Sequence, residues 1–91
     1  MDLVVHLPTL LRSSVGGRDS VVVDAATLRE GLQTLLVQHP LLRFHLYDDK
    51  GAFRTHVIVY YNGESVALME SLDVPLREGD ELEVINAVSG G

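Results

Sequence analysis

Apolar and polar residues alternate along several short stretches of the chain. Between Asp2 and Leu7 every second residue is apolar, and this alternation predicts a half-buried strand in which Leu3, Val5 and Leu7 face the core. The same signal, with valines enriched, predicts further strands over residues 20–24, 54–61, 64–68 and 81–88.

One segment has helical rather than strand spacing. Leucines recur three and four residues apart after Thr27, and Thr27 with Glu30 forms a capping box in which each side chain can bond the other residue's backbone amide. Pro40 disfavours helix at the residue before it, so we predict a helix over residues 28–38. Gly31 lies inside this helix, where glycine makes the helix about 1 kcal/mol less stable than alanine would. Close packing of the helix against a sheet would explain why a glycine is present there.

The remaining segments show neither a strand nor a helix period, and no element is assigned to residues 41–47. Residues 9–18 hold serines and two adjacent glycines, which is typical of a loop, and residues 41–47 are apolar without a clear period. Asn62-Gly63 predicts a type I′ hairpin turn. The order strand, strand, helix, hairpin, strand indicates an α+β domain with a β-grasp arrangement: a mixed sheet of four to five strands with one principal helix on one face. We assign residues 1–88 to this domain and residues 89–91 to a C-terminal tail.

Composition narrows the possible functions. The chain has 91 residues, a formal net charge of −6 and no cysteine, which fits one domain and excludes disulfides, cysteine-ligated metals and a cysteine nucleophile. The acidic balance argues against nucleic acid and anionic membranes and suggests a partner with a basic face. No apolar run approaches a membrane span. The N-terminal residues lack the features of a signal peptide, so a cytoplasmic location is expected.

The sequence contains no motif typical of a catalytic, metal-binding or phosphate-binding site. The four histidines have no metal-ligand spacing, and no nucleophile motif is present. Gly16-Gly17 precedes a predicted strand rather than a helix, so it does not form a phosphate cradle. We therefore expect no catalytic residue, no metal site and no intrinsic cofactor, and we predict that the chain is not itself an enzyme.

The C-terminal sequence, Ser89-Gly90-Gly91, is the unusual feature. Two residues without a Cβ can pass through a narrow channel and adopt backbone angles that other residues avoid. Fully extended, residues 87–91 would reach roughly 15 Å beyond the domain. Terminal glycines are also common at frayed chain ends, so these residues alone leave both interpretations open.

The chain resembles the ubiquitin-like sulfur carrier proteins of the MoaD/ThiS family, and within it the CysO type of cysteine biosynthesis. The resemblance covers essentially the whole chain. No single motif identifies the family, but the order of the motifs together with the terminal Gly-Gly does. In sequence they are Leu7-Pro8-Thr9-Leu10-Leu11-Arg12, Thr27-Leu28-Arg29-Glu30, His39-Pro40, Val57-Ile58-Val59-Tyr60-Tyr61-Asn62-Gly63-Glu64, Leu76-Arg77-Glu78-Gly79-Asp80-Glu81-Leu82 and Ala87-Val88-Ser89-Gly90-Gly91.

The resemblance implies a function for the C-terminus. In this family an ATP-dependent, E1-like adenylating enzyme activates the terminal carboxylate, here that of Gly91, and a sulfur donor displaces AMP. The product is a covalent thiocarboxylate, which the tail delivers to a sulfur-acceptor biosynthetic enzyme. In the CysO type the acceptor is a pyridoxal-phosphate (PLP) enzyme, and a metalloprotease later releases the product.

Partner recognition is expected on the sheet face away from the helix. Strand parity places five residues there, namely Val4, His6, Ile58, Tyr60 and Ile85. Ile58 stands where a polar residue would be expected, which leaves the identity of the partner open.

Three alternatives to the carrier remain: a ubiquitin-like modifier conjugated to lysines, the small subunit of a molybdopterin-synthase-like complex, and a plain β-grasp interaction domain. The acceptor pathway could be that of cysteine, thiamine, molybdopterin or a secondary metabolite.

Overall fold

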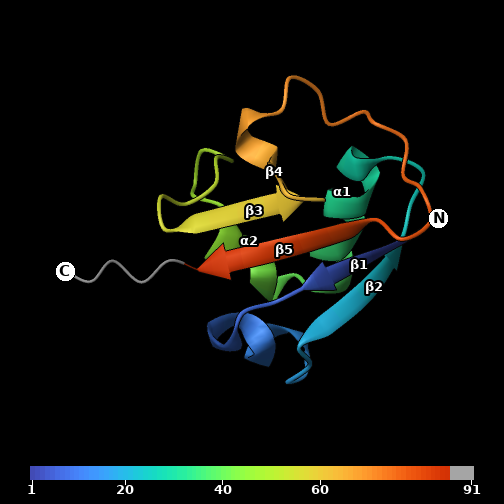
Figure 1. Cartoon of the computed structure of the whole chain (residues 1–91). Coiled ribbons are helices and arrows are strands. Elements are labelled where there is room, and N and C mark those ends of the chain that lie inside the picture. The colour runs from blue at the N-terminus through green and yellow to red at the C-terminus, as the bar shows by residue number, and fades with distance from the viewer. Residues whose placement is uncertain (87–91) are drawn as a thin grey trace.

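Five strands form one mixed sheet in the order β2-β1-β5-β3-β4, and a helix crosses one of its faces (Figure 1). The computed structural model describes residues 1–86. Along the chain the elements are β1 (Asp2–His6), the 3-10 helix η1 (Thr9–Val15), β2 (Ser20–Asp24), α1 (Leu28–Gln38), α2 (Leu41–Leu46), β3 (Val57–Tyr61), β4 (Glu64–Ser65), the 3-10 helix η2 (Val66–Leu68) and β5 (Glu81–Asn86).

The sheet has the β-grasp topology that the sequence predicts. The two central strands, β1 and β5, run parallel, while β2 and β3 flank them antiparallel and β4 pairs with β3. The predicted hairpin turn is also confirmed, because Asn62 and Gly63 both have positive φ, 48° and 86°, as a type I′ turn requires.

The core lies between the sheet and α1. Leu3, Val5 and Leu7 are buried as predicted, against leucines from one side of α1. Gly31 is where helix and sheet approach most closely, since a Cβ built on it would lie 2.9 Å from Leu3 Cδ2. The glycine inside the helix is therefore explained by this close packing.

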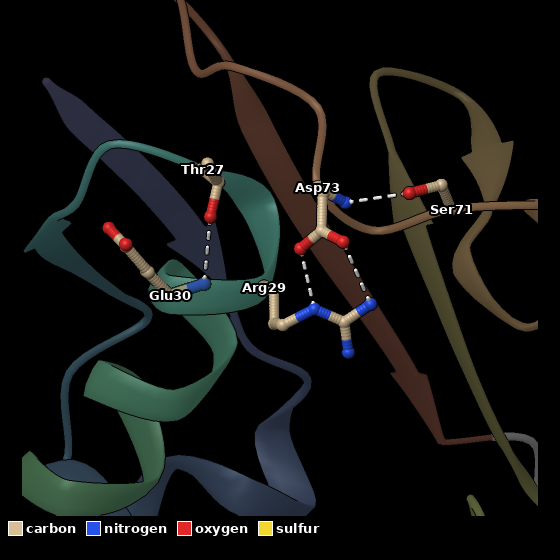
Figure 2. A network of polar contacts seen from close by, with 5 residues as sticks. All are labelled: Thr27, Arg29, Glu30, Ser71 and Asp73. Atoms are coloured by element: carbon tan, nitrogen blue, oxygen red, sulfur yellow. Dashed lines mark hydrogen bonds and ion pairs between the residues drawn. The ribbon is translucent and has the colours of Figure 1, made fainter.

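The start of α1 is capped by side chains. Thr27 Oγ1 accepts a hydrogen bond from Glu30 N at 3.2 Å, which confirms the predicted N-cap (Figure 2). The reciprocal bond differs from the prediction, because the Glu30 carboxylate accepts from Ala26 N at 3.1 Å rather than from the Thr27 amide. Thr27 instead forms an isolated bridge with Pro75, which draws its backbone toward the segment before β5.

That same segment closes over the first turn of α1. Arg29 Nε lies 2.7 Å from Asp73 Oδ1, and Ser71 Oγ accepts from Asp73 N at 3.1 Å (Figure 2). Carbonyls of Val74 and Leu72 accept from the first two amides of the helix, at 3.0 and 2.9 Å. Two of the amides that a helix leaves free at its start are thus satisfied by a segment more than forty residues later in the chain.

The structure differs from the sequence-based prediction in four segments. Residues 9–15 form the helix η1 rather than a loop, because this turn buries Leu11 and Val15. β3 begins at 57 rather than 54, since Arg54 N bonds back to Leu46 O. β4 ends after Ser65, where Val66 turns into the core. The apolar residues 41–46 form a short second helix, α2. Residues 87 and 88 of the last predicted strand lie outside the described residues.

Candidate functional site

The five residues predicted for partner binding all lie on the sheet face opposite α1. They alternate along β1, β3 and β5 with residues that are buried in the core. His6 and Ile58 are exposed, and Val4, Tyr60 and Ile85 are half-buried. The parity from which this face was predicted is therefore correct, while its role in binding stays a prediction.

The apolar residues of this face form two groups rather than one patch. Ile58 lies directly opposite Ile85 across β3 and β5, with Tyr60 the next outward residue on β3. Val4 lies two strands away, opposite Val22 on β2. Val22 is 54% exposed and was missed by the sequence analysis, although the parity of the strand over residues 20–24 could have revealed it.

A charged strip separates the two groups. Glu81 and Glu83 point outward from β5, and the His6 Nε2 atom lies 3.4 Å from Glu81 Oε1. A hollow of about 320 Å³ runs along this strip and is lined in part by His6, Glu83 and Ile85. A partner on this face would thus meet an apolar surface bordered by carboxylates.

The direction of β5 defines where the chain leaves the domain. Asn86, the last described residue, pairs with Val57 at the start of β3. The predicted tail residues Ser89, Gly90 and Gly91, and the predicted boundary after residue 88, lie outside the described residues. The outward group Ile58 and Ile85 lies beside Asn86, so this part of the face is closest to the point from which the tail continues.

A buried carboxylate organises the opposite end of the sheet. Asp80 accepts hydrogen bonds from the Tyr61 hydroxyl, from Asn62 Nδ2 at 3.0 Å and from Arg77 N at 2.8 Å. Burial alone would raise the pKa of Asp80, but these hydrogen bonds outweigh it and hold the pKa below its ordinary value. Burial and the bond to Asp80 raise the pKa of Tyr61 to about 12. Local patterns in the sequence do not reveal this network, whose only signal is an aspartate before the last strand.

Within residues 1–86 no three histidine, aspartate or glutamate side chains are grouped so that they could hold a metal ion. His39 is the histidine whose pKa is lowered, first by burial and then by the nearby charge of Arg18, and it lies at the end of α1 rather than on the outer face. In the same part of the chain, no helix has both the length and the apolar character needed to cross a membrane.

Comparisons with known proteins agree with this architecture. The model of the ThiS family matches residues 5–91. The chain is 30% identical to the sulfur carrier protein CysO of Mycobacterium tuberculosis over 93 aligned positions, covering 100% of both chains. It is 37% identical to small archaeal modifier protein 1 of Haloferax volcanii over 82 positions, covering 87% of this chain and 90% of that protein.

Solved structures show the same fold. The structure of the Amycolatopsis orientalis BexX/CysO complex contains a chain that matches with a TM-score of 0.79 at 30% identity, covering 98% of this chain and 99% of that one. SAMP1 from Haloferax volcanii matches with a TM-score of 0.78 at 31% identity over 100% of both chains. These relatives are small carriers and modifiers rather than enzymes, and the chain, with its ubiquitin-like β-grasp fold, belongs to the ThiS family of sulfur carrier and modifier proteins.

Proposed function

We propose that this protein is a sulfur carrier whose Gly91 carboxylate is converted to a thiocarboxylate. The observation that carries the proposal is that the family match extends to residue 91 and so includes the terminal Gly90-Gly91. Similarity to CysO along the whole chain supports a carrier. The proposal also accounts for how a chain without cysteine can hold a reactive sulfur atom.

The proposed chemistry takes place in two steps. A carboxylate is a poor acyl donor, so an adenylating enzyme first lets a Gly91 oxygen attack the α-phosphorus of ATP, which releases pyrophosphate and forms an acyl-adenylate. A sulfur nucleophile then attacks the carbonyl carbon. The carbon–sulfur bond forms as the bond to AMP breaks, and AMP leaves. The chain supplies the reacting carbon, and its partners supply the catalysis.

The folded domain would contribute recognition rather than catalysis. The outer sheet face, with Ile58 and Ile85 beside the end of β5, offers an apolar contact that can hold a partner close to the tail. Residues 87–91 are long enough to enter a pocket that the domain itself cannot enter. The acceptor that takes the sulfur would be a biosynthetic enzyme, which in the CysO type is PLP-dependent.

A protein modifier is the second candidate, and the 37% identity to an archaeal modifier protein favours it. Both functions begin with adenylation of the same carboxylate. They differ in the product, which is a thiocarboxylate for a carrier and an amide bond to a lysine side chain for a modifier.

Intact-mass measurement distinguishes these functions. The chain is incubated with ATP, its cognate adenylating enzyme and a sulfide source, and the wild type is expected to exchange one oxygen for sulfur. A variant lacking Gly91 is expected not to react, because the reacting carbon moves by roughly 3.5 Å. A variant extended beyond Gly91 is likewise expected not to react, and both variants are expected to keep almost the thermal stability of the wild type. Equal reaction of the truncated chain, or formation of lysine adducts alone, would contradict the carrier function.

A further inference from the structure

Charge is distributed unevenly along the direction of the strands. The segments 8–19 and 39–56 together hold five basic and three acidic side chains, so their formal charge is positive; these are Arg12, Arg18, Arg43, Lys50 and Arg54 against Asp19, Asp48 and Asp49. The rest of the chain holds two basic and ten acidic side chains. The two segments therefore carry a formal charge of 5 − 3 = +2 and the remainder 2 − 10 = −8, which together give the net charge of −6.

Both positive segments lie at the end of the sheet where β5 finishes. β1 and β5 are parallel, so the segment that follows β1 starts beside the end of β5, and β3 is antiparallel, so residue 56 precedes the Val57–Asn86 pair. α2 packs against η1, and Figure 1 shows both on the side of the molecule where β5 ends. A partner that binds the C-terminal residues must approach the end of the sheet where β5 finishes, and this is the end that carries the two positively charged segments.

Exposed apolar side chains gather at the same end. Phe44 on α2 is 68% exposed, and large apolar residues of η1, α1 and α2 are exposed with it, namely Leu10, Val37 and Leu41. Phe44 borders a hollow of about 400 Å³ whose other walls include Leu36, Tyr47, Arg43 and Arg54. An apolar hollow beside exposed aromatic and aliphatic residues is the form of a protein-docking surface.

The charges around this hollow are available to a partner. Among residues 1–86, neither Arg43 nor Arg54 forms an ion pair within 4.0 Å, and Arg54 is positioned by a 2.7 Å bond from its Nε to Phe44 O. The Asp48 carboxylate is engaged within its own turn, where Oδ1 accepts from the amides of Lys50 and Ala52 at 2.8 and 3.0 Å. Among residues 1–86 the guanidinium groups of Arg43 and Arg54 are therefore free of ion pairs, and the carboxylates of Asp48 and Asp49 line the hollow beside them.

We propose that the adenylating enzyme binds this end through an acidic surface surrounding the entrance to its active site, with an apolar side chain seated in the hollow beside Phe44. This inference rests on the proposed function. It differs from what the overall composition suggests, because an acidic chain predicts a basic partner, whereas the local charge where the tail departs has the opposite sign. Complementary charge at this end would orient the carrier with its C-terminus toward the enzyme.

The test is ATP–pyrophosphate exchange by the cognate adenylating enzyme, measured against carrier concentration. Arg43→Glu and Phe44→Ser are each expected to raise the KM for the carrier roughly tenfold without changing kcat, as loss of an interface contact does. The KM of the wild type is expected to rise with salt, and that of Arg43→Glu to rise less. Arg77→Glu and Leu68→Ser are the matched controls, because both residues are exposed outside the basic segments, and both are expected to keep the wild-type KM.

The outcomes separate this inference from the proposed function. A wild type that supports no exchange would overturn both. A wild type that supports exchange, with Arg43→Glu and Phe44→Ser at the wild-type KM, would overturn the docking surface alone. A lower KM for Arg43→Glu would also overturn it, because the enzyme surface would then be basic. Thermal unfolding of each variant shows that a raised KM does not reflect loss of the fold.

Discussion

The Tyr61 hydroxyl donates a hydrogen bond to the buried carboxylate of Asp80, and this contact ties the end of β3 to the turn that starts β5. Asn62 adds two bonds at the same place, one to Asp80 and one from Glu81 N to its own side-chain oxygen. The hairpin and the last strand are therefore held together at the end of the sheet opposite Asn86, the last described residue.

Tyr61→Phe should destabilise the domain by about 1.5–3 kcal/mol, the net contribution of a hydrogen bond to a charged group. Asp80 Oδ2 would keep the hydrogen bond from Arg77 N but lose the one from the Tyr61 hydroxyl, in a buried site. Urea denaturation of the pair measures the difference. Tyr60→Phe is the control, because the Tyr60 hydroxyl has no hydrogen-bond partner among residues 1–86, and an equal loss for both variants would contradict the role of this bond.

The free energy of unfolding should fall as the pH is lowered, in part because Asp80 becomes protonated. Its pKa is lowered from 3.8 in the folded state, so its contribution is present above about pH 4 and is lost as the pH falls through the folded pKa. Asp80→Asn removes this contribution. The difference in unfolding free energy between the wild type and Asp80→Asn should therefore be largest near pH 7 and shrink below pH 4. A difference that stays constant to pH 2 would show that Asp80 does not titrate in this way.

Gly31→Ala should destabilise the domain although alanine is the better helix former. The new Cβ would lie 2.9 Å from Leu3 Cδ2, and overpacking of about 1–3 kcal/mol exceeds the propensity gain of about 1 kcal/mol. A double-mutant cycle with Leu3→Val identifies the cause, since valine lacks the Cδ atoms. The penalty of Gly31→Ala should be smaller in the Leu3→Val background, and an unchanged penalty would place the clash elsewhere.

Thr27→Ala should reduce the unfolding free energy by about 0.5–2 kcal/mol, because the Glu30 amide loses its acceptor at the helix start. Denaturant titration measures the effect. Gln33→Ala is a matched exposed substitution within the same helix and should change the midpoint little. An unchanged midpoint for Thr27→Ala would mean that the carbonyls of Leu72 and Val74 suffice to cap α1.

Ile58→Asp should leave the fold intact and weaken binding of the adenylating enzyme or the sulfur acceptor. Ile58 is 36% exposed on the outer face, and an aspartate buried there by a partner would lose its water without gaining a counter-charge. Val59→Asp is the contrasting control, since Val59 is buried and its substitution should unfold the domain by circular dichroism. Wild-type affinity for Ile58→Asp would exclude this part of the face from binding.

Local patterns in the sequence predicted most of the strands and the limits of α1, and the order of these elements together with the family resemblance predicted the β-grasp fold. Alternation placed Leu3 and Val5 in the core because a strand turns successive side chains to opposite faces. Thr27 and Pro40 marked the ends of the helix because capping and the loss of an amide act within a few residues. The Asn62-Gly63 turn was predictable for the same reason, as two positive φ angles are a property of the turn itself.

Features that depend on distant segments were decided only by the tertiary structure. The helix η1 forms because it buries Leu11 and Val15 in the core. Asp80 accepts hydrogen bonds from Tyr61 and Asn62, which the folding of the hairpin brings close to it. The sequence by itself determined a net charge of −6 and a Gly-Gly terminus. Only the pairing of both β1 and β3 with β5 brought the two basic segments to the end of the sheet where β5 finishes, because charges far apart in the chain share a surface only once the strands between them are paired.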